Sequence, residues 1–246
     1  MGRLRWGMEV IDIFLRKLRA RHDISEAEEA TMRSVVTPER TLRVDEVAIR
    51  AGDELTESTI LLEGFMCRFK ELKNGERQIT ELHAAGDFVD LHSFSLKHLD
   101  HSIMALTPCR ISTMPHAAIT AITEQHPHLA RVFWFQTNLD AAIHREWELS
   151  LGRRSALARI AALFCELHVR LGIVGLTQGG EYTLPLTQTD LAECLGLTQI
   201  HVNRTLKELR ERQLVHFRSG RVRILDLDGL VGVAEFDPAY LYLAHH

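Results

Sequence analysis

The segment from residue 186 to residue 209 constrains the fold more than any other, because it predicts two short helices that meet at a glycine. Thr187 and Thr198 are each suited to cap a helix, and Gly196 suits the positive φ at which the first helix ends. Apolar residues at helical spacing join the two helices: Leu191, Ala192, Leu195, Leu197, Val202, Leu206 and Leu209. The pattern predicts a helix-turn-helix, which places its second helix in the major groove of DNA. An ordinary helical hairpin with a polar outer face is the alternative.

Polar and basic side chains gather on the outer face of the second predicted helix. At about 100° per residue, this face carries Ile200, Asn203, Arg204 and Lys207, with Gln199 at the N-terminal end. A helix that enters the groove N-terminus first directs such residues at base edges and phosphates. The residues predicted to contact DNA, including those of the hairpin described next, are Thr187, Gln188, Thr198, Gln199, Ile200, His201, Asn203, Arg204, Lys207, Arg218, Ser219 and Arg221.

Residues 213–226 predict a β-hairpin with Ser219-Gly220 at its tight turn. Arg218, Arg221 and Arg223 crowd that turn, as in a wing that lies on the DNA backbone. The whole chain has a net charge of −4, yet residues 198–224 hold seven Lys/Arg and two Glu, a net charge of +5. This local positive charge indicates a footprint on phosphate. A solvated run of charge is the alternative, but it leaves the difference in sign unexplained.

At 246 residues, the chain is long enough for two domains with separate cores. It contains no run of about 18 apolar residues, so we expect no transmembrane helix. The first residues lack a long apolar stretch and a small-residue cleavage site, so we expect no signal peptide, a cytoplasmic location and no membrane partner. The cysteines are Cys67, Cys109, Cys165 and Cys194. They form no CxxC pair, which disfavours a disulfide framework and an iron–sulfur cluster.

Helical and extended patterns divide the chain into three predicted parts. Helical spacing over residues 8–36 gives way, from about residue 41, to short alternating stretches with glycines 11 or 12 residues apart. This spacing predicts antiparallel strands. We therefore predict an α+β fold: an antiparallel β-roll or jelly roll with an N-terminal helix, forming a sensor in residues 1–127, a dimerisation helix in residues 128–151, and a winged helix-turn-helix DNA-binding domain in residues 152–246.

The long helix between the two domains is predicted to end at a hinge near Gly152. Its apolar residues recur close to the spacing of a coiled-coil seam, and those predicted to form a dimer interface are Leu129, Val132, Leu139, Ile143 and Trp147. A second copy of the chain is one way to cover this stripe and gives an isologous dimer. Packing on the chain's own β-domain is the alternative, and both can hold for different sides of the helix.

Over nearly its whole length, the chain resembles the Crp/Fnr family of bacterial regulators. The stretch LAECLGLTQIHVNRTLKELRERQLV with its basic hairpin carries most of the resemblance, and HAAGDFVDL is similar to the family's glycine-acid turn. The resemblance implies a homodimer that binds a palindromic operator in double-stranded DNA, responds to a small signal and acts on RNA polymerase. It also implies that Arg204 reads guanine through O6 and N7. Where this chain has Ile200, the family often has a glutamate that accepts a hydrogen bond from cytosine. Isoleucine cannot accept one, although it can touch a thymine methyl group.

The predicted signal site departs from the family's cyclic-nucleotide binders. Where their arginine holds the cyclic phosphate, this chain has Leu99-Asp100-His101, and no arginine occurs from residue 89 to residue 109. Burying a phosphodiester without a cation is costly, so we expect no useful binding of cyclic AMP. The family's N-terminal cysteine cluster is also missing, which disfavours an iron–sulfur cluster. The candidate effector pocket is Asp87, Phe88, Asp90, His92 and His101. Histidines of this loop are possible ligands for haem or a metal, but surface or core histidines are favoured and no metal site is assigned.

Together these patterns favour a DNA-binding transcription regulator. In this hypothesis, a signal in the β-roll repacks the long helix and reorients the two recognition helices; regulation by abundance alone also fits. The alternative is a ligand-binding β-barrel adaptor that acts through protein partners, which the basic hairpin and Arg204 oppose. An enzyme is disfavoured, because no GxSxG, HExxH, P-loop or paired-carboxylate motif appears.

Overall fold

The computed structural model describes residues 11–243, and the chain divides into two compact units. Within the described residues, unit 1 comprises residues 11–68, 83–141 and 243, and unit 2 comprises residues 69–82 and 142–242. Residues 1–10, on which the signal-peptide prediction falls, and residues 244–246 lie outside the described part of the chain. None of the described helices combines the length and the apolar character needed to cross a membrane.

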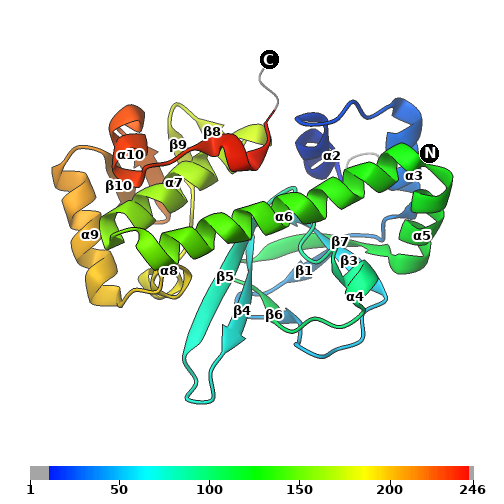
Figure 1. Ribbon diagram of the computed structural model, residues 1–246, viewed down its shortest axis with the longest axis horizontal. Coiled ribbons are helices and arrows are strands. Elements are labelled where there is room, and N and C mark those ends of the chain that lie inside the picture. Colours follow the sequence, from blue (N-terminus) through cyan, green and yellow to red (C-terminus); the bar gives the residue numbers. More distant parts are fainter. Residues whose placement is uncertain (1–10, 244–246) are drawn as a thin grey trace. The chain divides into compact units, whose positions relative to one another are not determined.

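The β-roll is built from short antiparallel strands (Figure 1). The strands described are β1 (Arg40–Leu42), β2 (Val47–Ile49), β3 (Glu57–Glu63), β4 (Phe65–Glu71), β5 (Arg77–Ala84), β6 (Ser102–Ala105) and β7 (Cys109–Pro115). One sheet has the order β1-β7-β3 and the other β2-β6-β4-β5. Leu61, Ile103 and Ile111, from both sheets, share one buried cluster. The turn after β3 requires glycine, since Gly64 has a φ of 92° and a Cβ there would lie 2.5 Å from the Pro108 carbonyl oxygen. The predicted β-roll is confirmed.

Short helices cover the β-roll of unit 1. They are α2 (Asp12–Arg19), α3 (Glu26–Val35), α4 (Ser93–Leu96) and α5 (His116–Gln125). The helical spacing predicted over residues 8–36 is divided, within the described residues, between α2 and α3, because Ser25 starts a new helix: its hydroxyl accepts the Glu28 amide while the Glu28 carboxylate accepts the Ser25 amide. Phe14 of α2 packs in the same buried cluster as Ile60 of β3, so this helix contributes directly to the sensor core.

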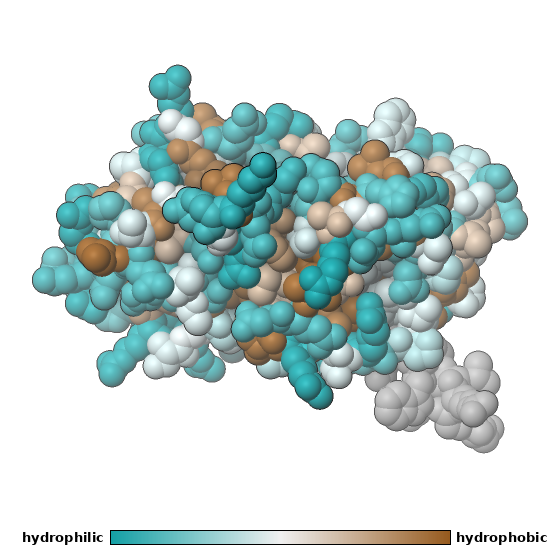
Figure 2. Space-filling view, turned by 90° about the horizontal axis from the view of Figure 1, so that it is seen from below, coloured by the Kyte–Doolittle hydropathy of each residue, from teal (hydrophilic) through white to brown (hydrophobic). Residues whose placement is uncertain are grey.

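Helix α6 (Pro127–Arg153) runs from unit 1 into unit 2. The five residues predicted to form the dimer seam, Leu129, Val132, Leu139, Ile143 and Trp147, are each at most 8% exposed in the single chain. The prediction that they face a second subunit is therefore wrong, because the chain itself covers its most apolar stripe, as the hydrophobic effect favours. Burial of such stripes leaves a largely hydrophilic exterior. On the face in Figure 2, hydrophobic residues appear only in small separate patches.

Unit 2 contains the winged helix-turn-helix. Its elements beyond α6 are α7 (Ala156–Ile173), β8 (Thr177–Gln178), β9 (Glu181–Thr183), α8 (Gln188–Leu195), α9 (Gln199–Glu211), β10 (Val215–Arg218), β11 (Arg221–Ile224), α10 (Leu227–Ala234) and the 3₁₀ helix η1 (Pro238–Leu241). The sheet order is β10-β11-β9-β8, and α7 packs against both α9 and α10. The helix break at Arg154 and Ser155 falls within residues 152–155, the segment predicted to form the hinge; α6 continues through Arg153, and the Ser155 hydroxyl caps α7.

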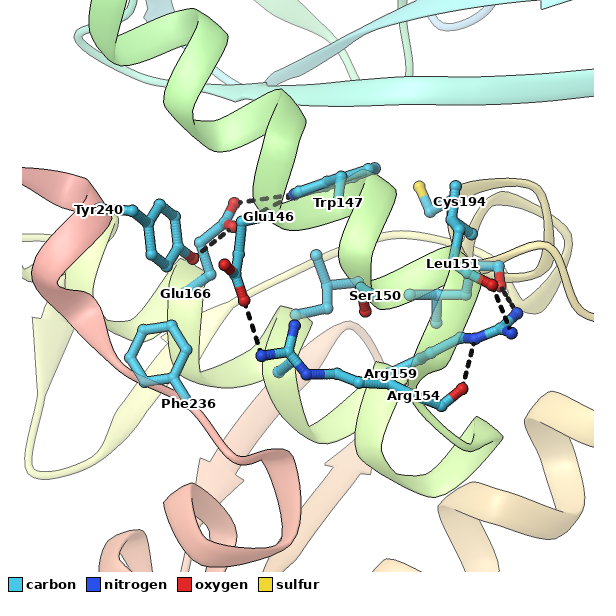
Figure 3. Close-up of a pocket in the computed structure, with 13 residues that line it drawn as sticks. Glu146, Trp147, Ser150, Leu151, Arg154, Arg159, Glu166, Cys194, Phe236 and Tyr240 are labelled. Carbon is cyan, nitrogen blue, oxygen red and sulfur yellow. Dashed lines mark hydrogen bonds and ion pairs between the residues drawn. The ribbon is translucent and has the colours of Figure 1, made fainter.

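A buried polar network ties α6 to α7 and η1 within unit 2 (Figure 3). Glu166 of α7 is 2% exposed. Its carboxylate accepts hydrogen bonds from Trp147 Nε1 at 3.2 Å and the Tyr240 hydroxyl at 2.7 Å, both drawn in Figure 3. It also accepts one from Arg170 Nη1 at 2.8 Å. These donors offset the cost of removing the carboxylate from water. Burial and the neighbouring carboxylate raise the pKa of Tyr240, so its hydroxyl remains a donor. Trp147 therefore forms its hydrogen bond within the single chain and does not need a second subunit as a partner.

Candidate DNA interface

Two helix caps and one glycine hold α8 and α9 in place. The Thr187 hydroxyl accepts the Asp190 amide at 3.1 Å, and the Asp190 carboxylate accepts the Thr187 amide at 2.7 Å. Gly196 ends α8 in the left-handed conformation, with φ of 59°. The Thr198 hydroxyl accepts the His201 amide at 3.2 Å and starts α9. The predicted caps and turn are confirmed. The hydroxyls of Thr187 and Thr198 are used for capping.

The two sides of α9 differ in burial. Val202 and Leu209 are fully buried, as predicted, while Leu206 is half-buried and Thr205 takes a buried position that the apolar pattern missed. The predicted outer residues are all exposed: Gln199, Ile200, His201, Asn203, Arg204 and Lys207. The helix therefore presents this face to solvent. That these side chains contact DNA stays a prediction.

The Arg204 guanidinium is free to bind a ligand, as far as the described residues show. It is exposed, and it forms no hydrogen bond or ion pair with residues in the described part of the chain. Lys207, one turn further on, lies 3.6 Å from the Glu211 carboxylate in an exposed pair, which contributes little. The planar fork of Arg204 is thus available for the O6 and N7 acceptors of guanine.

The wing places two arginines directly opposite each other. In the register of β10 and β11, Arg218 pairs with Arg221 across a turn in which Ser219 and Gly220 have φ of 51° and 71°. Like charges at directly opposed positions destabilise a hairpin. Both arginines are exposed, and among the described residues neither forms an ion pair. A bound phosphate would relieve their repulsion, whereas Arg223 already contacts Glu181 at 3.2 Å.

The sequence pattern missed one contact at the front of α9. Gln199 Nε2 donates to the Thr189 hydroxyl of α8 at 2.7 Å. This bond draws the Gln199 amide towards α8 and fixes its direction. No periodic signal marks a pair ten residues apart across a turn, so only the folded structure identifies Thr189.

Three predicted effector residues have structural roles in unit 1. Asp87 is 4% exposed and binds the Lys17 ammonium and the Ala84 amide. Phe88 packs edge-on against Phe14, with ring centroids 5.0 Å apart. Asp90 is fully buried and accepts the Thr59 amide. Burial raises the pKa of Asp90 to about 7, although this hydrogen bond opposes the shift.

His92 and His101 do lie together, with ring centroids 5.3 Å apart. Beside them the structure brings in a cation that the sequence analysis missed. Arg68 of β4, 3% exposed, donates to the Val89 carbonyl at 2.6 Å and forms an ion pair with Asp140 of α6 at 2.6 Å. Burial alone would raise the pKa of Asp140, but Arg68 and nearby histidines lower it to about 2. The loop that carries His92 and His101 therefore lies beside a buried arginine, Arg68, whose charge is already neutralised by the Asp140 carboxylate.

Known proteins share both domains of this chain. A family model for the cyclic nucleotide-binding domain matches residues 39–126, and one for the Crp-like helix-turn-helix domain matches residues 158–232. The transcriptional activatory protein AadR of Rhodopseudomonas palustris is 32% identical over 186 residues, covering 73% of this chain and 74% of the relative. The transcriptional activator protein FnrA of Stutzerimonas stutzeri is 24% identical over 200 residues, covering 81% and 82%.

The fold also recurs in a solved structure. FixK2 from Bradyrhizobium japonicum superimposes with a TM-score of 0.74 at 24% identity, covering 81% of this chain and 97% of that one. These relatives do not support the alternative of an adaptor without DNA binding, nor do they support an enzyme. The shared domains, the level of identity and the helix-turn-helix geometry lead to one conclusion: this chain belongs to the Crp/Fnr family of DNA-binding transcription regulators.

Proposed function

We propose that this regulator acts as a homodimer, which places one α9 in each of two adjacent major grooves of a palindromic operator. The observation that carries the proposal is the exposed outer face of α9, with an uncommitted Arg204, next to a wing whose opposed arginines lack counter-charges among the described residues. Arg204 then reads guanine, and Arg218 and Arg221 hold phosphates. The protein works in the cytoplasm, where it recruits or blocks RNA polymerase.

The outer face of α6 is the dimer surface in this proposal. Exposed residues recur along α6 at alternating intervals of four and three, while Leu149 and Arg153 are also exposed but lie outside this repeat. The residues of the repeat are Pro127, Arg131, Trp134, Asn138, Ala141, Arg145, Glu148 and Gly152. This is the repeat of a coiled-coil seam. Trp134 is 71% exposed at its centre, and Asn138 one step on is of the kind that fixes register in paired helices. A second copy of α6 would cover both.

The signal is something other than cyclic AMP. A cyclic phosphate in this loop would have to compete with the Asp140 carboxylate for Arg68. It would also meet Asp100, which already pairs with His101 at 2.9 Å. Arg68 lies 3.4 Å from His92 Nδ1 and repels a cation there, which supports a sensor without a metal or haem on these histidines. The wide separation of the four cysteines in the sequence, with no CxxC pair, supports a protein without an iron–sulfur cluster.

Equilibrium binding to duplex DNA tests the proposal. An operator is first selected from random duplexes with the full-length protein, and the dissociation constant is then measured at fixed salt concentration. Arg204→Ala should weaken operator binding by about 1–3 kcal/mol and relax the preference at one base pair. The matched control is Arg210→Ala, which removes the same charge from an exposed position near the end of α9. If both variants lose the same amount of operator affinity and keep the same base preference, Arg204 does not read a base.

A further inference from the structure

Ile200 is conspicuous in the first turn of α9. It is 79% exposed, above every other large hydrophobic side chain in the described part of the chain; Trp134 follows at 71%. Scattered exposed apolar residues are normal on a protein surface. Ile200, however, lies two residues after the Thr198 cap, at the end of the helix that enters the groove first. Its position indicates a role in the complex.

The neighbours of Ile200 define what it can touch. Residues three and four apart on a helix are adjacent, so Ile200 shares one patch with Asn203 and Arg204, both exposed. Gln199 does not cover it, because its amide is bound to the Thr189 hydroxyl at 2.7 Å. The β-branched side chain has few χ1 rotamers in a helix, so little conformational freedom remains to be lost when a surface is placed against it.

We propose that Ile200 selects thymine in each operator half-site by packing on its 5-methyl group. This inference rests on the proposed DNA-binding function and names the base that the patch reads beside Asn203 and Arg204. The thymine methyl is the one apolar group that base pairs present in the major groove. Against cytosine, isoleucine would instead cover the N4 amino donor and leave it without an acceptor, which is unfavourable. An A·T pair is therefore the pair that gains from contact with Ile200.

Replacement of thymine by uracil tests this directly, since it removes the methyl group and keeps the base pairing. Each thymine of the selected operator is replaced in turn, in both half-sites, and binding of the full-length protein is measured by fluorescence anisotropy. One position per half-site should weaken binding of the unmodified protein by about four- to tenfold, as expected for one buried methyl group. Ile200→Ala should bind the thymine and uracil forms equally. Leu176→Ala, a substitution at an apolar residue of the same unit that is 47% exposed and outside the predicted contacts, should keep the preference.

Two results would overturn the inference. One is an operator in which no thymine-to-uracil change affects binding. The other is an Ile200→Ala variant that retains the full preference for thymine, which would mean that another group contacts the methyl. Failure of the proposed DNA-binding function would give a distinguishable result, because the unmodified protein would then enrich no sequence in the selection and bind no duplex. Because the Ile200 side chain is mostly exposed, loss of folding is not expected to obscure the comparison.

Discussion

Tyr240→Phe removes a single hydroxyl from the buried network that joins α6, α7 and η1. In the structure this hydroxyl donates to Glu166 Oε2 at 2.7 Å, and the carboxylate is 2% exposed. A hydrogen bond to a charged group contributes about 1.5–3 kcal/mol. Trp147 and Arg170 stay bound to the carboxylate after the change, so Glu166 is not left without donors. We therefore expect the free energy of unfolding to fall by about 2 kcal/mol.

The same unit provides a matched control. Tyr182 is buried, whereas Tyr240 is half-buried, and the Tyr182 hydroxyl donates to the neutral carbonyl of Phe164 at 2.9 Å. Tyr182→Phe deletes the same atom, but the lost acceptor carries no charge. A neutral hydrogen bond contributes about 1 kcal/mol. The difference between the two variants then isolates the effect of the Glu166 charge.

Urea unfolding of the full chain, followed at equal protein concentrations, measures both losses. If the m-value is the same for all variants, they differ in stability and not in the surface exposed on unfolding. Equal protein concentrations hold the contribution of dimer formation to the measured stability constant. A double-mutant cycle with Glu166→Gln should recover most of the Tyr240 effect as coupling energy. Should Tyr240→Phe cost no more than Tyr182→Phe, the charge-assisted bond would be absent in solution and the argument for the network would fail.

Two further predictions concern unit 1 and α6. Burial raises the pKa of Asp90 to about 7, so the folded state holds a proton that the unfolded state releases between about pH 4 and 7. The free energy of unfolding should fall by up to about 4 kcal/mol as pH rises through this window. Asp90→Asn, which cannot ionise, should flatten this dependence on pH in urea titrations. If the dependence is unchanged in the variant, a group other than Asp90 causes it. Trp134→Glu should make the protein monomeric in sedimentation experiments and abolish tight operator binding, whereas Ala121→Glu, exposed on α5, should remain dimeric. A dimeric Trp134 variant would rule out the proposed seam.

The helix-turn-helix could be predicted because its determinants are local. Thr187, Gly196 and Thr198 each act within three or four residues along the chain, through a cap or a left-handed turn. The tight turn of the wing depends on Ser219 and Gly220 alone. Such features can be recognised from the sequence alone, because the groups that interact are close neighbours in it.

Contacts between distant segments left no comparable signal. Arg68 and Asp140 are 72 residues apart, and their ion pair changed the electrostatics expected for the loop around His92. On α6 the difficulty was different, because both faces carry coiled-coil spacing. The apolar face suggested the dimer seam, but a monomer buries its most apolar stripe first. The more polar face, with Trp134 at its centre, was overlooked for that reason.

The distribution of charge decides which part of the protein approaches DNA. Residues 198–224 carry +5 in a chain of −4, which leaves −9 on all the remaining residues. A phosphate backbone attracts the first group and repels the second, with the effect confined to about 8–10 Å by salt. Phosphate contacts carry no sequence information, so in the proposed complex the wing arginines would orient the protein and Asn203, Arg204 and Ile200 would discriminate between bases. In the proposed complex, the net negative charge of the remaining residues therefore favours approach to the phosphate backbone through the segment that contains α9 and the wing.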